Sequence, residues 1–242
     1  MKQFISMIVL AAVLATFGAT SAFALASSKF AAQLSDLTLV ESTTAADWTT
    51  VLNTSIKTPN KKDLLIGGSL ETALFTQTQV KGRNGSTTSS SATATLEVRL
   101  LIDGKAYDSD SQTGAFPPKV VYDKRAQTLS ATLGGVIVSC KDLNADGIIT
   151  VATECTVTDE MIELILQTMS AHHFNYVVKN LTPGVHKVEL QVRVGTDTAI
   201  DDSLGGSGTA SATAGVGRGS LTVEEVRAIN QVELGAGIEF LQ

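Results

Sequence analysis

The chain has 242 residues, a formal net charge of −6 at pH 7 and only 17% charged residues. Its basic residues are scattered along the sequence instead of clustered, which argues against a nucleic-acid partner. Aromatic residues make up 5% of the chain, and Thr, Ser, Ala, Val and Gly are abundant. This composition is typical of a β-rich protein with many turns, and the length suffices for one sizeable core.

The start of the chain, residues 1–24, has the features of a secretory signal peptide. Lys2 supplies the positive charge, residues 4–17 are apolar, and small residues follow. Cleavage is expected after Ala24 or Ala26, where A-x-A-like sites end. The apolar stretch is shorter than the ~20 residues that a membrane-spanning helix needs. We therefore expect an exported protein, extracellular, on the cell surface or periplasmic, with no membrane span in the mature chain.

Residues 27–47 are expected to form an N-terminal extension ahead of a single domain at 48–242. Within this extension, residues 30–40 have the apolar content of a strand and precede a polar spacer at 41–47. The leucines of this stretch are Leu34, Leu37 and Leu39. Such a strand could add to the sheet edge of a neighbouring subunit and so produce a homo-oligomer. Pairing within its own domain is equally compatible with the sequence.

Alternation of apolar and polar residues is the dominant pattern and predicts β-strands with one wet face. The clearest examples are Thr95–Asp103 and Val185–Val194. Further strand candidates are Trp48–Ile56, Leu64–Val80, Val120–Tyr122, Thr128–Val138, Phe174–Val178, Thr209–Val216 and Leu221–Ile229. Turn residues separate these segments. The predicted fold class is therefore mainly β, an antiparallel β-sandwich of jelly-roll type.

One inserted helix is predicted at residues 159–169. Acids occupy its first turn, apolar residues recur at helical spacing, and Thr158 is a candidate N-cap. Together with the loop before it, this helix would form an insert at 140–171. The segments 81–91 and 201–208 have the composition of surface loops.

The chain contains two cysteines, Cys140 and Cys155. In an exported protein they are expected to form a disulfide, because disulfides persist in oxidising compartments. Closing a loop of this size contributes about 3 kcal/mol in the chain-entropy model. Two free buried thiols are the alternative, while a zinc site is disfavoured because no nearby histidine has ligand spacing.

The two cysteines bracket a segment rich in side-chain oxygens. Asp142, Asn144 and Asp146 stand at alternate positions and are followed by Gly147. This pattern resembles the start of an EF-hand or dockerin-type calcium loop, in which positions 1, 3 and 5 supply side-chain oxygens and position 6 is glycine. The resemblance implies Ca²⁺ as the cofactor. Its implied ligands are Asp142, Asn144, Asp146, the carbonyl of Ile148, and Thr150 directly or through water.

The resemblance departs from the family at position 12, which normally carries a bidentate acid. Here that position is Thr153, and Glu154 follows one residue later. Either the loop is stretched so that Glu154 is the ligand, or the site lacks this ligand and binds weakly. Extracellular sites of this kind bind at about 10⁻⁴–10⁻³ M, which favours a structural role. A polar turn without metal is the alternative.

No catalytic motif stands out: the sequence has no Gly-x-Ser-x-Gly elbow, no His-Glu-x-x-His and no phosphate-binding loop. We therefore expect a non-enzymatic, secreted, calcium-binding β-sandwich that acts as an extracellular or cell-surface structural subunit, self-assembling by strand addition. The alternative is a carbohydrate-binding, lectin-like module with glycan as partner. The aromatic residues available to such a module are Trp48, Tyr107, Phe116, Tyr122, Phe174 and Tyr176.

Overall fold

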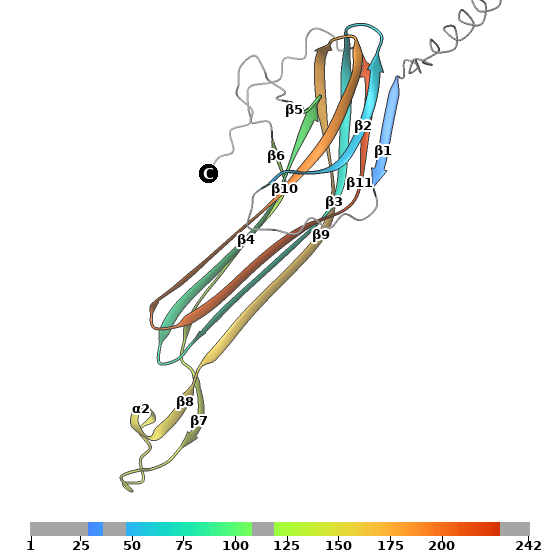
Figure 1. Ribbon diagram of the computed structural model, residues 1–242. Helices are drawn as coiled ribbons and strands as arrows, with labels where there is room; N and C mark the ends of the chain where they lie inside the picture. Colours follow the sequence, from blue (N-terminus) through green and yellow to red (C-terminus); the bar gives the residue numbers. More distant parts are fainter. Residues whose placement is uncertain (1–28, 36–46, 108–118, 228–242) are drawn as a thin grey trace, which may run out of the picture.

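The computed structural model describes residues 29–35, 47–107 and 119–227, which form a long sandwich of two antiparallel sheets (Figure 1). The first sheet has the order β1 (Phe30–Ser35), β11 (Ser207–Val226), β3 (Lys62–Gly82) and β9 (Glu160–Leu181). The second sheet has the order β2 (Thr49–Thr58), β10 (Gly184–Leu204) and β4 (Ser86–Ile102), with β6 (Val120–Leu133) and the short β5 (Lys105–Ala106) both beside β4. The predicted signal peptide lies outside the described residues.

The strand order is that of a jelly roll. Leaving out β5 and the small hairpin β7–β8, the strands in chain order are β1, β2, β3, β4, β6, β9, β10 and β11. Numbered one to eight, they give sheets of order 1-8-3-6 and 2-7-4-5, with antiparallel neighbours throughout. This is the double-sheet arrangement built from two Greek keys, so the predicted fold class is confirmed.

The period-two segments form the central strands, as their pattern predicts. In β4 and in the first half of β10, up to Val194, alternate side chains point between the sheets and are buried, because a strand sends successive side chains to opposite faces. Leu190 of β10 lies between Leu100 of β4 and Leu52 of β2 in the register of the second sheet. The core around them consists mainly of Leu, Ile and Val, among them Ile56, Leu64, Ile66, Leu96, Val98, Val188, Val192, Leu221 and Val223. We call this part the apolar end of the sandwich.

Toward the β3–β4 turn, the space between the same sheets holds mainly hydroxyl and amide side chains. We call this part the polar end, and its buried polar residues are Thr76, Thr78, Thr88, Ser90 and Gln127. Gln127 joins the two sheets: its Oε1 accepts a hydrogen bond from Thr76 (2.7 Å), and its Nε2 donates to Thr78 (2.6 Å) and to the carbonyl of Leu164 (2.8 Å). Buried polar groups that are paired in this way avoid the penalty of unmade hydrogen bonds.

The helix predicted at 159–169 is wrong, because residues 160–169 belong to β9. They pair with β3 residue by residue, from Met161 opposite Lys81 to Met169 opposite Ala73. The apolar residues fit a helix at every fourth position, but they also suit a strand that is apolar on both faces, and two of them are β-branched isoleucines. Long-range pairing with β3 therefore decides between two local patterns of similar quality.

The loops predicted at 81–91 and 201–208 are also wrong, because strands run through most of both segments. A tight turn joins β3 to β4, with Asn84 at φ 56° and Gly85 at φ 77°. Both residues lie in the left-handed region, and the turn carries the chain from the first sheet to the second, because β3 and β4 do not pair with each other. The serines and threonines that follow belong to β4 and line the polar end. The two strands predicted within 120–138 are instead the long β6 and the separate β7.

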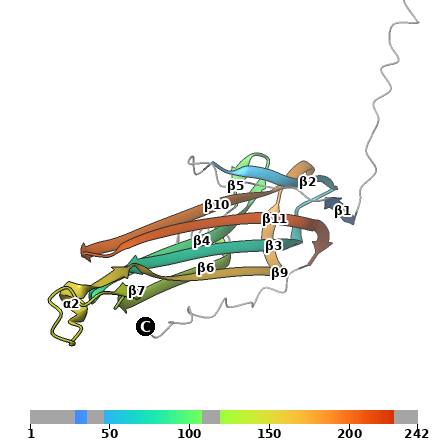
Figure 2. The same ribbon diagram turned by 90° about the horizontal axis from the view of Figure 1, so that it is seen from below.

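A small hairpin projects beyond the polar end of the sandwich (Figures 1 and 2). It consists of β7 (Val136–Cys140), β8 (Cys155–Thr158) and, between them, a single helical turn α2 (Val151–Glu154). The predicted insert at 140–171 is thus a small hairpin, closed by the disulfide, that leads into strand β9, with α2 as its short helix. Within the described residues, no helix is long and apolar enough to cross a membrane.

Candidate functional site

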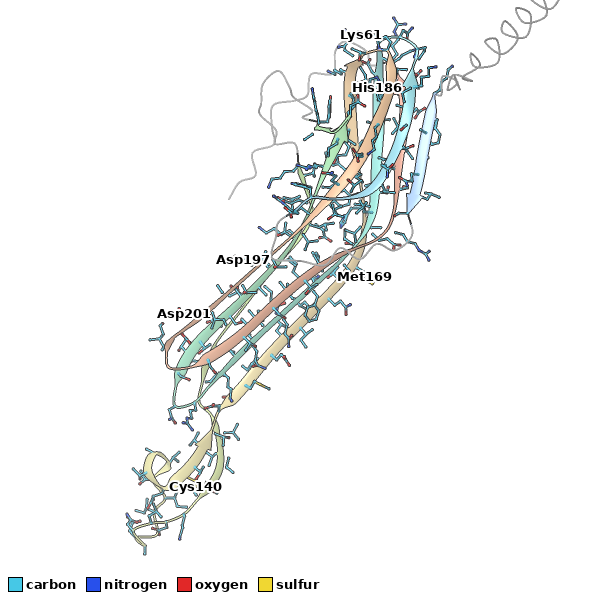
Figure 3. The ribbon with its side chains drawn as sticks, viewed as in Figure 1. Lys61, Cys140, Met169, His186, Asp197 and Asp201 are labelled. Atoms are coloured by element: carbon cyan, nitrogen blue, oxygen red, sulfur yellow. A yellow bond between two sulfur atoms is a disulfide. The ribbon has the colours of Figure 1, made fainter. Side chains whose placement is uncertain are left out.

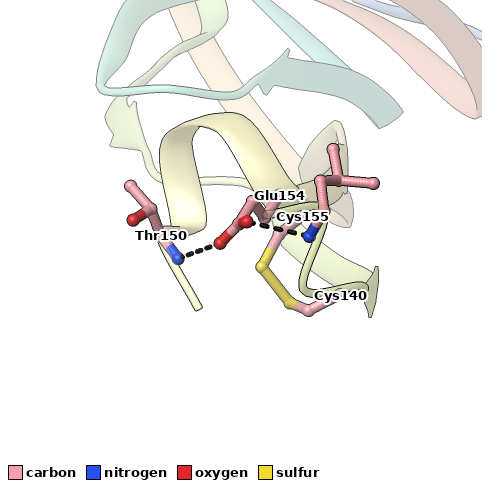
Figure 4. The surroundings of a disulfide bond; sticks show 5 residues. Cys140, Thr150, Glu154 and Cys155 are labelled. Carbon is pink, nitrogen blue, oxygen red and sulfur yellow. Dashed lines mark hydrogen bonds between the residues drawn. A yellow bond between two sulfur atoms is a disulfide. The ribbon is translucent and has the colours of Figure 1, made fainter. Parts of the chain in front are cut away.

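The disulfide predicted between Cys140 and Cys155 is present and closes the base of the loop (Figure 4). The two cysteines are directly opposite in the β7–β8 ladder, with Cα atoms 4.0 Å apart. Beside them, the Lys141 N–H donates to the Glu154 carbonyl (2.8 Å). The disulfide and the backbone hydrogen bonds beside it therefore close the loop where it leaves the β7–β8 ladder. Cys140 lies at the opposite end of the molecule from His186 (Figure 3).

The loop turns sharply at the positions where the calcium-loop pattern requires a turn. Ala145 has φ 57° and Gly147 has φ 80°, both in the left-handed region. Glycine adopts this region without strain, which explains its place at position 6. The turn brings the Gly147 N–H to the carboxylate of Asp142, where it donates to Oδ2 (2.9 Å).

The other two predicted side-chain ligands face their neighbours in the same turn. Asn144 Nδ2 donates to Asp146 Oδ2 (2.9 Å), and the Asp146 N–H donates to Asn144 Oδ1 (3.3 Å). The Ile148 N–H donates to Asp146 Oδ1 (2.7 Å). These contacts concentrate oxygen atoms on one short stretch of backbone, as an Asx-rich turn does.

Glu154 has a role that the sequence did not reveal. One carboxylate oxygen accepts from the Leu143 N–H (2.9 Å) and the other from the Thr150 N–H (2.7 Å), so the side chain ties both ends of the loop together (Figure 4). The hydrogen bonds from Thr150 and then Leu143 lower the pKa of Glu154, because they favour its charged form. These two hydrogen bonds depend on the helical turn α2, because that turn brings the Glu154 side chain back to the N–H of Thr150, four residues earlier.

One atom of the loop is consistent with a bound cation. Asp142 Oδ1 is buried and has no hydrogen-bond partner, and a buried carboxylate oxygen without a partner is costly. Among the described residues, no three His, Cys, Asp or Glu side chains gather to hold a metal by themselves. The implied ligand set also draws on the Asn144 amide, the Ile148 carbonyl and Thr150. The donors present are hard oxygens, the type that calcium prefers.

A second polar cluster lies at the seam between β6 and β9. Ser170 Oγ donates to Asp123 (3.0 Å) and lies 2.8 Å from His172 Nε2, while Thr72 Oγ1 also donates to Asp123 (2.6 Å). Burial alone would raise the pKa of Asp123, but the hydrogen bonds from Thr72 and Ser170 outweigh it and lower that pKa. Asp123 approaches the same ring nitrogen as the serine (3.4 Å), whereas a catalytic triad needs the acid on the other nitrogen. The cluster therefore joins the two sheets.

The aromatic residues considered for a glycan platform make protein contacts where the structure describes them. The Trp48 ring lies under the guanidinium groups of Arg99 (4.3 Å) and Arg193 (4.9 Å). Tyr122 is buried and donates to the Gly68 carbonyl (2.8 Å), and Tyr176 is buried against Phe174. Tyr107 donates to the Val177 carbonyl (2.8 Å), and Phe116 lies outside the described residues. A glycan platform needs free ring faces, so these contacts do not favour the lectin-like alternative.

The N-terminal strand β1 lies at the edge of the first sheet and pairs with β11 of its own chain. The ladder runs from Phe30 opposite Glu224 to Ser35 opposite Gly219. Half of its six side chains are exposed, Leu34 by 80%, none is fully buried, and only Ala31 packs against the core. The Gln33 side chain also accepts a hydrogen bond from the Asn53 N–H. Backbone hydrogen bonds thus hold β1 far more than buried side chains do.

No protein-family model matches the chain, and no curated protein matches it. Among solved structures, it is similar to a chain in the structure of the infectious bursal disease virus Gx strain, with 13% identity and a TM-score of 0.29. That match covers 82% of this chain and 33% of the viral chain. A chain of the T13 IBDV viral particle matches with 12% identity and a TM-score of 0.16, over 83% of this chain and 40% of that one. This chain therefore spans well under half of these viral chains, and the fold assignment rests on the strand order.

Proposed function

We propose that the protein is an exported, non-enzymatic structural subunit that assembles by exchange of its N-terminal strand. In the assembly, β1 of one copy takes the place beside β11 of the next copy. The observation that carries this proposal is the way β1 is held: a six-residue ladder to β11 with few buried side chains. Strand addition uses the same kind of main-chain ladder between subunits.

Exchange of β1 replaces each contact by an identical one from another copy. Its free-energy difference is therefore small, and protein concentration decides the outcome, as in domain swapping. The chain between Ser35 and Thr49 has 13 residues (49 − 35 − 1), which fully extended would reach at most about 45 Å. This length is enough for β1 to leave its own sheet edge and reach the corresponding edge of an adjacent copy.

Calcium has a structural role in this proposal, at the end of the molecule opposite β1. The buried, unpartnered Asp142 Oδ1 supports a cation in the loop. When bound, the ion would supply positive charge to the oxygens of Asp142, Asn144 and Asp146. Glu154 would hold the two ends of the loop together by accepting hydrogen bonds from the N–H groups of Leu143 and Thr150. The ion would thus rigidify the exposed hairpin tip of each subunit.

Deleting residues 27–40 tests the assembly. The shortened chain is expected to keep the sandwich, because the core contains only Ala31 from this segment, and to lose the multimers that the mature chain forms. Light scattering gives the mass, and circular dichroism gives the fold. A synthetic peptide of residues 27–40 should bind the shortened chain. Multimers of unchanged size after the deletion would rule out β1 as the connecting strand.

Replacing Asp142→Asn tests the calcium loop. The wild-type protein is expected to bind Ca²⁺ at about 10⁻⁴–10⁻³ M, and the variant at least about tenfold more weakly, because affinity follows the number of charged ligands. Isothermal titration calorimetry measures both. Asp202→Asn removes an exposed acid on β10 and should leave the affinity unchanged. Absence of binding by the wild type at 10 mM Ca²⁺, an upper limit roughly tenfold above the expected range, would favour a metal-free turn.

A further inference from the structure

Strand β9 forms the other edge of the first sheet and has an exposed apolar stretch. In the described chain it pairs with β3 alone, so its second row of backbone groups has no strand partner. Met169 is 74% exposed and Ile165 is 52% exposed on the outward face. The exposed apolar residues of this stretch are Met161, Ile162, Leu164, Ile165, Leu166 and Met169. We call residues 160–170 the β9 edge.

The edge strand of the second sheet, β6, is protected by charges over part of its length, at residues 123–125, while residues 126–133 carry none. Strand β6 carries consecutive charges at Asp123, Lys124 and Arg125, the kind of residues that discourage strand pairing. Between Met161 and Met169, β9 contains a single charge, Glu163, and neither lysine nor proline. That charge is directed along its own sheet, because Gln77 of β3 donates a hydrogen bond to it. A long apolar edge without such protection is suited to pairing with another strand.

We propose that the β9 edges of two copies pair with each other, antiparallel and centred on Ile165. In this register Ile165 faces Ile165 of the second copy, and Met161 faces Met169. Glu163 faces Gln167, so no acid lies opposite an acid. On the inward face, Leu164 faces Leu166. The central pairs are thus apolar with apolar or charged with polar, as cross-strand stabilisation requires. The exception is Ile162, which faces Thr168.

The register is specific, because the neighbouring ones lose this match. In an antiparallel pair, directly opposed residues lie on the same face of the sheet. A two-fold axis perpendicular to the sheet must therefore lie midway between the two copies of one residue. Centring on Leu164 places Glu163 opposite Ile165, and centring on Leu166 places Glu163 opposite Met169. Both bury an acid against an apolar side chain. A sequence that matches itself in one register is the property expected of an isologous interface.

This inference deepens the proposed function by adding a second contact between subunits, and it rests on that function for its biological role. Strand order places β1 and β9 at opposite edges of the same sheet. One copy can therefore exchange β1 at one edge and pair through β9 at the other. Exchange of β1 would link subunits in series, and the β9 edge would join two such series side by side.

Cysteine substitution in the full-length mature chain tests the register. Ile165→Cys places two thiols directly opposite in the proposed dimer, and oxidation should give a covalent dimer as the main species. Gln167→Cys is the matched control, because this residue is also exposed and lies on the same face. In the dimer its two copies are four residues out of register, about 13 Å apart along the strand, too far for a disulfide. This control should stay mainly monomeric on a non-reducing gel.

Three outcomes would overturn the inference. Equal cross-linking of both variants would show random collision or another register. Absence of cross-linking at Ile165→Cys would show that the edges do not meet. Cross-linking that appears only after residues 228–242 are deleted would assign the edge to that segment of the chain.

Ile165→Lys gives a second, independent measurement, because a charge at the axis would face its own copy. The β9 dimer mass should be lost while the melting temperature stays near that of the wild type, since the side chain is exposed. Strand exchange is measured separately, by cysteine cross-linking between positions Ala32 and Thr222 of the β1–β11 ladder. Failure of the β9 pairing is therefore distinguishable from failure of the proposed function.

Discussion

The two ends of the sandwich are filled differently, although the same strands run through both. At the apolar end, Leu100 and Leu190 lie in an aliphatic core. At the polar end, Gln127 and the threonines of β3 replace that core with hydrogen bonds between the sheets. Burial of apolar area contributes about 25 cal/mol per Å², while a typical hydrogen bond contributes about 1 kcal/mol net. The difference indicates that the apolar end supplies most of the stability and the polar end mainly fixes how the sheets are aligned.

The largest effect is expected from a cavity at the apolar end. Leu190→Ala should lower the free energy of unfolding by about 2–5 kcal/mol, because the residue is fully buried. The control Leu204→Ala lies on the same strand but is exposed, and should change stability by less than about 0.5 kcal/mol. Denaturant unfolding measures both. Equal losses for the two variants would contradict the division between the ends.

A smaller effect is expected at the polar end. Gln127→Ala removes the partner of two buried threonine hydroxyls and of the Leu164 carbonyl, and should lower stability by about 1–3 kcal/mol. Thr128→Ala, an exposed neighbour on β6, is the matched control. Hydrogen exchange of β3 and β9 amides should rise in the Gln127 variant. A loss as large as that of Leu190→Ala would mean that the polar network, and not the aliphatic core, dominates.

The smallest effect is a pH dependence at the seam between the ends. Thr72 and Ser170 lower the pKa of Asp123 in the folded state despite its partial burial. Its contribution to stability is therefore present above the unfolded pKa of about 3.9, and it is lost as the pH falls through the lower folded pKa. The melting temperature should fall less steeply between pH 5 and pH 2 in Asp123→Asn than in the wild type, a window that spans roughly one to two units on each side of the unfolded value. Parallel curves would show that Asp123 contributes nothing to the acid dependence.

Much of the apolar end was predictable from the sequence, because a strand with one buried face leaves a period-two pattern. Thr95–Asp103 and Val185–Val194 carry that pattern and lie in β4 and β10. The polar end was not predictable in the same way. Its inward residues are serine and threonine, so the segment 81–91 has the composition of a loop. The error at 159–169 has the opposite cause, because β9 is apolar on both faces and so matches a helix as well.

In the candidate site too, features set by a few neighbouring residues were predictable from the sequence, and features that depend on the folded arrangement were not. The disulfide was predictable from the two cysteines and the expected export of the chain, and the turn was predictable from Gly147. The two hydrogen bonds accepted by Glu154 could not be predicted, because they depend on where α2 places the carboxylate relative to Leu143. The calcium ligands remain a prediction, supported by the buried Asp142 Oδ1.

The most direct test of strand exchange is a cysteine pair across the β1–β11 ladder. Ala32 lies opposite Thr222, so the double variant Ala32→Cys, Thr222→Cys can be joined by oxidation or by a short thiol cross-linker. The native disulfide lies within one hairpin and does not link copies. Exchange predicts a covalent ladder of multimers on a non-reducing denaturing gel, with single-cysteine variants giving dimers at most. A single cross-linked monomer band at assembly concentrations would contradict the account.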